Sequence, residues 1–279
     1  MSKKPDLSSH TALVTGAAGG IGFEFAKELA SCGATLILLD ISAGNLNKAK
    51  VHLKSFSISR SGSKEFSDLR IHLLPLDLTS EKLIEEVERF CNQNSLEPDI
   101  LINNAGIFSF KPISETATHK IEAFIDIHVR AVTLLSQWFV NKRKFFGSGW
   151  MLNMSSMSCW MPMPGLAMYS STKSYIRVFT RSLHYEMKDF GVGVTVACPG
   201  GIATDLFGLP KNLQRFAVKI GVLQTPETFA CKAIKKMMKK KKQYINGWLN
   251  RFSIFFIGIL PTPVRMMVKH HLLDKGITR

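Results

Sequence analysis

A tyrosine and a lysine four residues apart could form an acid–base pair. Tyr169 and Lys173 open a stretch, residues 169–190, whose apolar spacing predicts a helix, so both side chains share one helix face. A phenol has a pKa of about 10, too high for a good base at neutral pH. A neighbouring ammonium favours the phenolate, so we expect Lys173 to lower the pKa of Tyr169. Such a pair could move a proton to or from an alcohol oxygen, although an isolated pair is also typical of a solvated helix face.

A glycine-rich turn near the N-terminus could hold the phosphates of a dinucleotide. Residues 15–22 read T-G-A-A-G-G-I-G and lie between an apolar run and a helical pattern. Glycines let the backbone approach a pyrophosphate, and the following helix offers unpaired N–H groups and the positive end of its dipole. A glycine cluster can be only a structural turn, but the flanking strand and helix favour binding. The predicted contacts are Gly16, Ala18, Gly20, Ile21 and Gly22.

An acidic residue ends the next apolar run, eighteen residues after the last glycine of the turn. Asp40 could accept hydrogen bonds from both ribose hydroxyls of NAD and would repel the 2′-phosphate of NADP. No Arg or Lys follows in residues 41–43. The pattern favours NAD over NADP, with Ile41 as a further contact, although an aspartate here is also typical of a strand-end turn.

Alternating strands and helices must position these groups. Short apolar runs predict strands at residues 11–14, 34–39, 71–76, 99–102, 150–154 and 192–197. Helical patterns follow residue 22 and cover residues 81–90, 119–144 and 169–190. Apolar strands that alternate with amphipathic helices indicate a parallel sheet covered on both faces. We expect an α/β fold, a Rossmann-like doubly wound parallel sheet in a single domain with a C-terminal helical extension.

Several motifs, in this order, resemble the classical short-chain dehydrogenase/reductase (SDR) family over about residues 8–205. The motifs are Thr15–Gly22, Asp77-Leu78, Asn103-Asn104-Ala105-Gly106, Asn153-Met154-Ser155-Ser156, Tyr169-x-x-x-Lys173 and Pro199-Gly200-Gly201-Ile202-Ala203-Thr204. The resemblance implies an oxidoreductase that transfers hydride between a nicotinamide cofactor and a secondary alcohol or ketone, with Tyr169 as acid/base. We expect residues 1–205 to form the dinucleotide-binding and catalytic core, and residues 206–279 a substrate lid and a basic and apolar extension of the same domain.

The resemblance also implies further cofactor contacts. Asp77 and Leu78 would contact the adenine, and Lys173 would hydrogen-bond the nicotinamide ribose beside Tyr169. The segment after the fourth predicted strand would pass beside the cofactor, and the segment after the sixth would hold the nicotinamide end. The residues concerned are Asn104, Ala105, Gly106, Pro199, Gly200, Ile202 and Thr204.

Two further positions follow from the family pattern. Ser156, thirteen residues before the tyrosine, has the spacing of the serine that binds the substrate oxygen, with Ser155 as the adjacent alternative. Family members usually carry an asparagine in the long helix, where it helps to hold a water that links the lysine to solvent. Here His128 occupies that place. A neutral imidazole could play part of this role, or His128 could be a packed helix residue.

The loop at residues 157–165 carries Met and Trp but no charge. Flexible thioethers suit a bulky apolar ligand, although core packing explains them equally well. We therefore expect a lipophilic substrate, steroid-like or acyl-like.

The formal charge of +15 is concentrated at the C-terminus, where thirteen Lys or Arg face only Glu227 and Asp274 from residue 219 onward. Lysines in residues 232–242 precede an apolar run at 248–260, which is too short for a membrane span of ~20 residues. The pattern fits peripheral membrane contact, docking of an acidic carrier protein, or a solvated helix face followed by a helix that closes the pocket. The absence of a recognisable nucleic-acid-binding pattern argues against nucleic acid.

Composition and the family pattern bound the remaining expectations. Five scattered cysteines without a C-x-x-C pair argue against a disulfide framework and a metal site. No apolar run follows the first residues, so we expect a cytoplasmic protein, or one at the inner face of a membrane. The family resemblance implies a homodimer or homotetramer through the two long helices. A dinucleotide-binding sensor or scaffold without turnover is the alternative function, and retention of Ser156, Tyr169 and Lys173 speaks against it.

Overall fold

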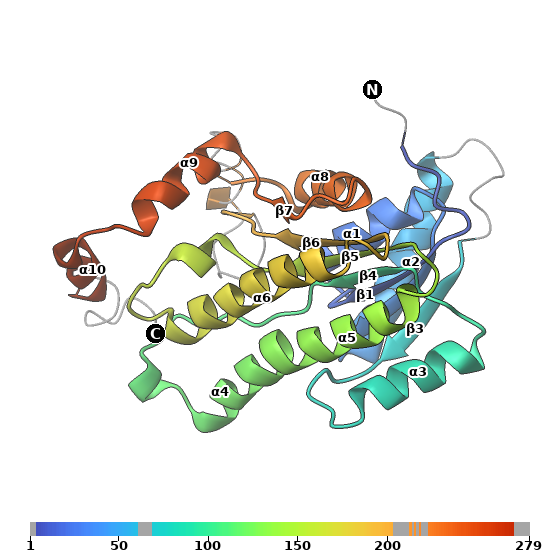
Figure 1. The fold of residues 1–279 in the computed structure, drawn as a ribbon, viewed down its shortest axis with the longest axis horizontal. Helices are drawn as coiled ribbons and strands as arrows, with labels where there is room; N and C mark the ends of the chain where they lie inside the picture. Colours follow the sequence, from blue (N-terminus) through green and yellow to red (C-terminus); the bar gives the residue numbers. More distant parts are fainter. Residues whose placement is uncertain are drawn as a thin grey trace.

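Parallel strands in the order β3-β2-β1-β4-β5-β6-β7 form the central sheet of the computed structural model (Figure 1). The structure describes residues 4–60, 69–202, 212, 213, 215, 218 and 223–270. Within these residues the strands are β1 (Thr11–Thr15), β2 (Thr35–Asp40), β3 (Ile71–Pro75), β4 (Ile100–Asn103), β5 (Gly149–Met154), β6 (Val192–Ala197) and β7 (Gln243–Tyr244).

Helices cover both faces of this sheet. One layer contains α1 (Gly20–Ala30), α2 (Ala43–Arg60) and α8 (Pro226–Met238), and the other contains α3 (Leu83–Gln93), α5 (Ala131–Arg143) and α6 (Ala167–Glu186). A π-helical turn, η3 (Asp126–Arg130), joins α4 (Thr118–Ile125) to α5. Shorter elements are η2 (Ile113–Glu115), η4 (Met157–Trp160), α9 (Trp248–Ile257) and α10 (Thr262–Val268).

Alternation along the strands explains the two layers. Val14 and Leu38 pack under α1 and α8, while Leu13 and Leu39 face α3 and α5, and all four are almost fully buried. A strand buried on both faces has no polar side to alternate with, which is why these strands appear as continuous apolar runs. The predicted α/β fold with a doubly wound parallel sheet in a single domain is confirmed.

Helix α2 and strand β7 were not predicted from the sequence. Helix α2 presents only a few apolar residues, among them Leu46 and Leu53, so its periodicity is weak. Strand β7 is the second: α8 ends at Met238, before the last lysines of residues 232–242. Lys240 has a positive φ of 50°, which turns the chain, and the carbonyl of Lys242 then accepts a hydrogen bond from the Val196 N–H of β6. Pairing with the sheet edge therefore overrides helix propensity here.

The strand order places a crevice beside β1. This strand pairs with β2 on one side and with β4 on the other. The chain connections on its two sides therefore run in opposite directions along the sheet. In open α/β sheets, ligands bind at this switch point, beyond the carboxyl ends of the strands. The side chain of Thr15, at the end of β1, accepts hydrogen bonds of 3.0 Å from the N–H groups of Asn104 and Ala105. The glycine turn is thereby fixed to the loop after β4.

Candidate active site

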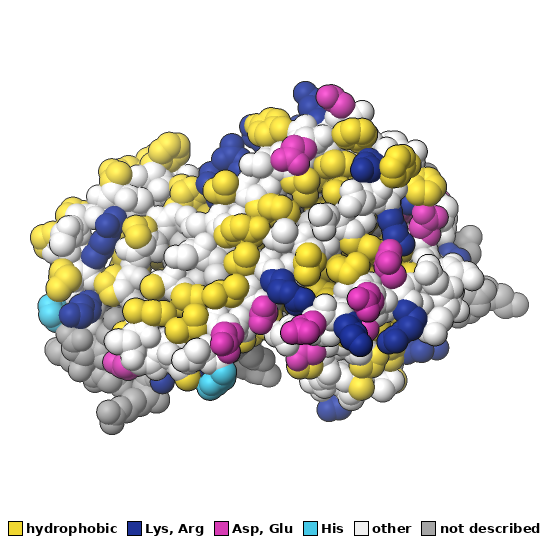
Figure 2. Space-filling model, turned by 60° about the horizontal axis from the view of Figure 1, so that its bottom comes forward, with side chains coloured by type: hydrophobic (Ala, Val, Ile, Leu, Met, Phe, Trp, Pro, Cys, Tyr) yellow, Lys and Arg dark blue, Asp and Glu magenta, His cyan; other side chains and the backbone are white. Residues whose placement is uncertain are grey.

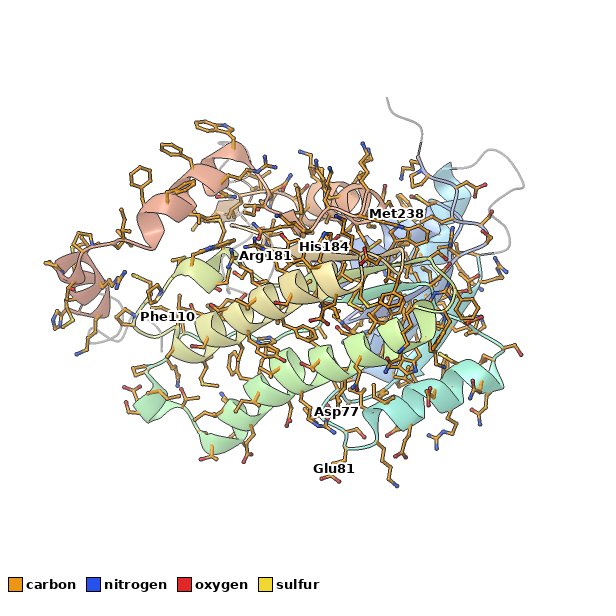
Figure 3. All side chains as sticks on the ribbon, viewed as in Figure 1. Asp77, Glu81, Phe110, Arg181, His184 and Met238 are labelled. Carbon is orange, nitrogen blue, oxygen red and sulfur yellow. The ribbon has the colours of Figure 1, made fainter. Side chains whose placement is uncertain are left out.

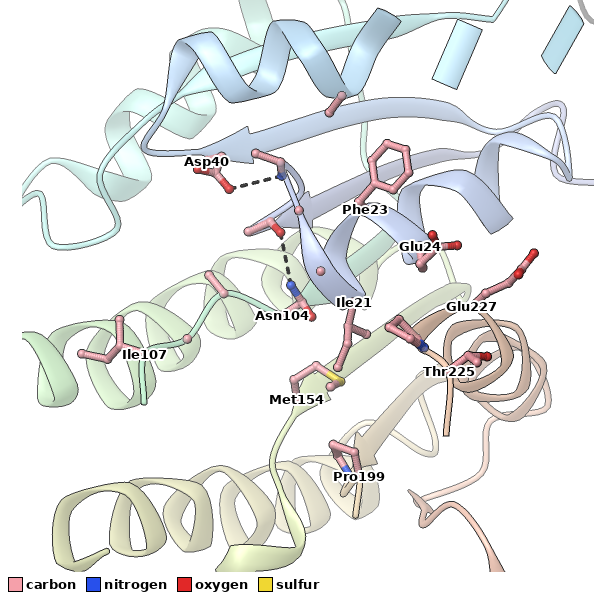
Figure 4. Close-up of a pocket in the computed structure, with 18 of the residues that line it drawn as sticks. Ile21, Phe23, Glu24, Asp40, Asn104, Ile107, Met154, Pro199, Thr225 and Glu227 are labelled. Carbon is pink, nitrogen blue, oxygen red and sulfur yellow. Dashed lines mark hydrogen bonds between the residues drawn. The ribbon is translucent and has the colours of Figure 1, made fainter. Parts of the chain in front are cut away.

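A cavity of about 1190 Å³ opens at the carboxyl ends of the strands (Figure 4). Its volume exceeds the range of roughly 300–1,000 Å³ found for most small-molecule sites. Eleven of the predicted cofactor residues line it: Gly16, Ala18, Gly20, Ile21, Asp40, Asn104, Ala105, Gly106, Tyr169, Lys173 and Pro199. The tertiary structure thus brings the glycine turn, the acidic residue and the tyrosine–lysine pair into one space.

The glycine turn has no room for side chains at its base. A Cβ on Gly22 would lie 2.0 Å from the carbonyl oxygen of Gly16, and a Cβ on Gly16 would lie 2.9 Å from the Cα of Ala105. Gly16 also has a φ of +63°, a conformation that disfavours other residues. Nothing lies within 4 Å of the Cβ positions of Gly19 and Gly20, which line the cavity. This close turn with an open cavity face fits the pyrophosphate of a dinucleotide.

Asn104 holds the two sides of the crevice together. Its side-chain N–H₂ donates to the carbonyl of Thr15 at 3.0 Å and to that of Gly16 at 3.4 Å, the latter drawn in Figure 4. This residue therefore has a structural contribution to the turn in addition to the cofactor contact that the sequence predicts.

Asp40 lies at the end of β2 and faces the cavity. Its carboxylate accepts hydrogen bonds from the N–H of Ala18 at 3.2 Å and from that of Ser42 at 3.1 Å. Lys48 and His52 of α2 line the same cavity and were missed by the sequence analysis. Their spacing of four residues would have indicated a shared helix face, had α2 itself been predicted.

Tyr169, Lys173 and Ser155 line the cavity, and the Ser156 side chain lies beside the phenol of Tyr169. A hydrogen bond from the Ser156 side chain favours the phenolate of Tyr169, but burial of the phenol has the larger effect and raises its pKa. The expectation that Lys173 lowers this pKa is wrong for this structure. The ammonium of Lys173 lies 5.8 Å from the centre of the tyrosine ring and donates to the carbonyl of Met154 at 3.0 Å. Burial lowers the pKa of Lys173 itself to about 8.

The adjacent serine has a different environment. The hydroxyl of Ser155 donates to the carbonyl of Lys173 at 2.7 Å, which links the end of β5 to α6. The hydroxyl of Ser156 accepts from the N–H of Ser158 at 3.1 Å, at the start of η4. Of the two serines, Ser156 is the one whose side chain acts on the tyrosine phenol, whereas Ser155 lines the cavity, so the choice between them stays a prediction.

His128 is fully buried in the π-helical turn η3, where both ring nitrogens have partners. The Ile107 N–H donates to Nε2 at 3.1 Å, and Nδ1 lies 2.9 Å from the hydroxyl of Thr172. Burial, with a smaller effect of the Lys173 charge, holds the pKa of His128 well below its ordinary value. The ring is therefore neutral, and because Nε2 accepts, the proton lies on Nδ1 and is donated to Thr172.

This geometry shows how His128 lies relative to Tyr169 and Lys173. A Cβ on Gly106 would lie 2.8 Å from its Nε2 and 3.3 Å from the Nζ of Lys173, so imidazole and ammonium flank the same glycine. Thr172 in turn donates to the carbonyls of Met168 at 2.9 Å and Tyr169 at 3.1 Å. His128 thus joins the loop after β4 to the helix that carries the tyrosine, a positioning role that a merely packed residue would not have.

We expect His128→Leu to destabilise the protein by roughly 1–3 kcal/mol, because the N–H of Ile107 loses its acceptor while the core volume is kept. The free energy of unfolding in urea measures the effect. His119→Leu, at an exposed position of α4, is the control and should change stability little. Unchanged stability in His128→Leu would contradict the hydrogen-bonding role.

Several predicted cofactor residues lie outside the cavity lining. Asp77 and Ile41 are exposed, and Leu78 is buried in the core. Gly22 lies behind the turn, the N–H of Gly200 donates to the Asn246 side chain, and Ile202 is buried. Thr204 and most of residues 205–225, the part of the chain expected to form the substrate lid, are outside the described residues. The cofactor contacts of these residues therefore remain predictions.

The described part of the chain has neither a metal-binding cluster nor a membrane-spanning helix. It contains no group of three His, Cys, Asp or Glu side chains that could hold a metal ion. None of its helices combines the length and apolar character that crossing a bilayer requires.

Comparison with known proteins agrees with this architecture. Residues 10–211 match the model of the short chain dehydrogenase family. The chain is 30% identical over 200 residues to cyclopentanol dehydrogenase of Comamonas testosteroni, covering 72% of this chain and 76% of that protein. It is 29% identical over 257 residues to a very-long-chain 3-oxoacyl-CoA reductase-like protein of Arabidopsis thaliana, covering 90% and 77%.

Solved structures show the same fold. A short-chain dehydrogenase from Sphingobium yanoikuyae, in complex with NADPH, superposes with a TM-score of 0.73 at 21% identity, covering 94% of this chain and 96% of that one.

The doubly wound sheet and the glycine-lined cavity define a dinucleotide-binding α/β enzyme. The match of the family model over most of the chain then identifies the particular family, and the chain belongs to the short-chain dehydrogenases. These are oxidoreductases that use NAD or NADP and act on alcohols or ketones.

Proposed function

We propose that this protein is an NAD-dependent oxidoreductase that interconverts a lipophilic secondary alcohol and its ketone, with Tyr169 as the acid/base. The observation that carries the proposal is the approach of the Ser156 side chain to the phenol of Tyr169 beside Lys173, at a cavity with a dinucleotide-type glycine turn. Two hydroxyls that converge in this way can both bind one substrate oxygen.

The proton chemistry follows from the environment of Tyr169. Because burial raises its pKa, Tyr169 keeps its proton at neutral pH and can donate it to a carbonyl oxygen during reduction. Ser156 can donate a second hydrogen bond to the same oxygen and stabilise the charge that develops there. In the opposite direction the phenolate accepts the alcohol proton, and the Ser156 side chain favours that charged form.

The residues present fit a nicotinamide dinucleotide. Gly16 and Gly22 leave space only for backbone, and Asp40 faces the side of the cavity where a ribose following the pyrophosphate would lie. When bound, the cofactor supplies or accepts the hydride, and the protein aligns it with the substrate carbon. Asp40 supports NAD in preference to NADP, since its carboxylate can bind two hydroxyls but would repel a phosphate.

We expect Asp40→Ala to change cofactor preference. Loss of the carboxylate removes the repulsion of a 2′-phosphate and leaves Lys48 and His52 on that side of the cavity. The ratio of kcat/KM for NAD over NADP should fall about tenfold or more, equivalent to roughly 1.4 kcal/mol. Initial rates with both cofactors measure it. Asp126→Ala, at the start of η3, is the control, and an unchanged ratio in Asp40→Ala would argue against a role in cofactor choice.

An apolar substrate is supported by the walls around the catalytic groups. Met154 and Ile107 line the cavity beside Tyr169, and the ring of Phe108 lies edge-on to the tyrosine, 5.0 Å between centres. The names of two relatives refer to apolar compounds of these kinds. One is a cyclopentanol dehydrogenase, named for a cyclic alcohol, and the other a very-long-chain 3-oxoacyl-CoA reductase-like protein, named for an acyl compound. Steroid-like and acyl-like alcohols are therefore the first compounds to test.

A homodimer or homotetramer is supported by the outer face of the long helices. Val178 and Tyr185 of α6, and Phe145 just after α5, are exposed apolar side chains. Figure 2 turns the helices α3 to α6 toward the viewer and shows hydrophobic side chains across this face. Chemical cross-linking or light scattering would determine the assembly.

A substrate screen tests the proposed function. Purified protein is given NAD or NADP with a panel of cyclic, steroid-like and acyl-like alcohols, and formation of reduced nicotinamide is followed by absorbance. We expect turnover with at least one lipophilic alcohol and NAD. Tight NAD binding without turnover of any compound would favour the sensor or scaffold instead.

A further inference from the structure

Helix α9 presents its apolar side chains to solvent. Trp248 is 79% exposed, Phe255 76% and Ile259, just beyond the helix, 74%. Together with the exposed Phe252 and Phe256, they recur at intervals of four, three, one and three residues, which places them on one face of the helix. Figure 3 shows ring side chains that project from α9 away from the rest of the chain. A row of outward rings is unusual for a surface that meets only water.

A basic pocket of about 600 Å³ lies at the start of this row. Three lysines of α8, the lysine that follows the helix, and two residues of α9 line it: Lys232, Lys235, Lys236, Lys239, Trp248 and Arg251. No Asp or Glu is among its lining residues. Within the described chain, none of the four lysines has a carboxylate within 4.0 Å. The pocket therefore offers concentrated positive charge to an anion.

The two features share residues. Trp248 both lines the basic pocket and opens the row of exposed rings, and Arg251 of the same helix lines the pocket as well. We propose that α8 and α9 form a docking surface for a bilayer that contains anionic phospholipid. Headgroup phosphates bind in the lysine pocket, and the rings of α9 enter the boundary between headgroups and acyl chains.

Charge decides between a bilayer and a second copy of this chain. A symmetric dimer through this face would bring identical patches together, so the two lysine pockets would repel each other. An anionic bilayer is complementary to both features at once, because its surface is negative and its interior is apolar. A solvated lysine face would explain the charges but not the exposed row of rings.

The docking surface adjoins the catalytic site. Helix α9 contacts η4, which begins directly after Ser156, and the side chain of Asn250 lies against Gly200, where a Cβ would come within 2.3 Å of Nδ2. A lipophilic substrate dissolved in the bilayer would thus be close to the wall of the cavity. This consequence rests on the proposed function, whereas membrane docking itself does not.

Vesicle binding tests the docking surface with the full chain. Phosphatidylcholine vesicles with and without phosphatidylserine are sedimented with the protein, and binding is expected only when phosphatidylserine is present. Of the four tryptophans, Trp248 is the most exposed, so its emission should shift to shorter wavelength on binding. Inorganic phosphate alone should produce no such shift. These readouts are independent of turnover, so failure of the proposed function would leave them unchanged.

Two pairs of variants separate the contributions. Lys232→Gln with Lys239→Gln should weaken binding roughly thirtyfold, and Trp248→Ser with Phe255→Ser should abolish it at physiological salt. Lys54→Gln with Lys120→Gln removes the same charge from exposed positions outside this surface, and should retain binding. Absence of binding to phosphatidylserine vesicles would overturn the proposal. Binding that persists in the ring variants would also overturn it and would favour an acidic protein as the partner. A change of molecular mass in the ring variants would overturn it as well and would favour a second copy of this chain.

Discussion

Tyr169→Phe should lower kcat by about 10³-fold while the affinity for the dinucleotide stays nearly unchanged. The substitution removes one hydroxyl from a buried ring and keeps its packing, so only the proton donor and its interaction with the Ser156 side chain are lost. General acid–base groups typically contribute about 10²–10⁴ in rate. Steady-state kinetics with the substrate found in the screen, and a titration with NAD, measure the two quantities.

Tyr185→Phe is the matched control because this tyrosine lies on the same helix, α6, with its ring exposed. Its kcat should remain at the wild-type value. Full activity in Tyr169→Phe would exclude this residue as the acid/base and would require another proton donor in the cavity.

The same assignment predicts the pH profile of the wild-type protein. Oxidation requires the phenolate, and burial raises the pKa of Tyr169 above its ordinary value, so the oxidation rate should increase with pH throughout the neutral and mildly alkaline range. Reduction requires the protonated phenol, so its rate should be constant over this range and fall only at higher pH.

Gly22→Ala should abolish tight cofactor binding and destabilise the protein by roughly 1–3 kcal/mol. The added methyl group would lie 2.0 Å from the carbonyl oxygen of Gly16 and 2.5 Å from the side-chain nitrogen of Asn104. The backbone of the turn would have to move, and the hydrogen bonds from Asn104 to Thr15 and Gly16 would be strained or lost. Titration with NAD should show an affinity reduced about a hundredfold, equivalent to roughly 3 kcal/mol.

Gly44→Ala is the control for this substitution. Gly44 lies in the first turn of α2, and nothing is within 4 Å of its Cβ position. Alanine is favoured over glycine in helices, so this variant should be as stable as the wild type or slightly more stable. If Gly22→Ala bound NAD as tightly as Gly44→Ala, the turn would not be the pyrophosphate site.

Most of the sheet could be predicted because its strands are buried on both faces. Leu36 to Leu39, for example, form an uninterrupted apolar run with an acidic residue at its end, and this run is β2. Helix α2 and strand β7 could not be predicted in the same way. The helix buries only a narrow stripe, and β7 forms because Gln243 and Tyr244 meet the open edge of β6.

The candidate site was predictable where chemistry depends on local spacing. A helix places Tyr169 and Lys173 on one face whatever surrounds it, and a turn between a strand and a helix needs glycine wherever the backbone passes closely. The direction of the Tyr169 pKa was not predictable in this way. It depends on how many neighbouring groups remove water from the phenol, and those neighbours come from distant parts of the chain.

By itself, therefore, the sequence determined the alternation of strands and helices, the glycine turn, and the residue types of the catalytic pair, because each follows from neighbours within a few positions. Only the tertiary structure decided that burial raises the pKa of Tyr169, that His128 is neutral and bonded to Ile107 and Thr172, and that the rings of α9 face outward beside a lysine pocket. Desolvation and surface exposure are properties of the packed chain, since they are set by residues far apart in sequence.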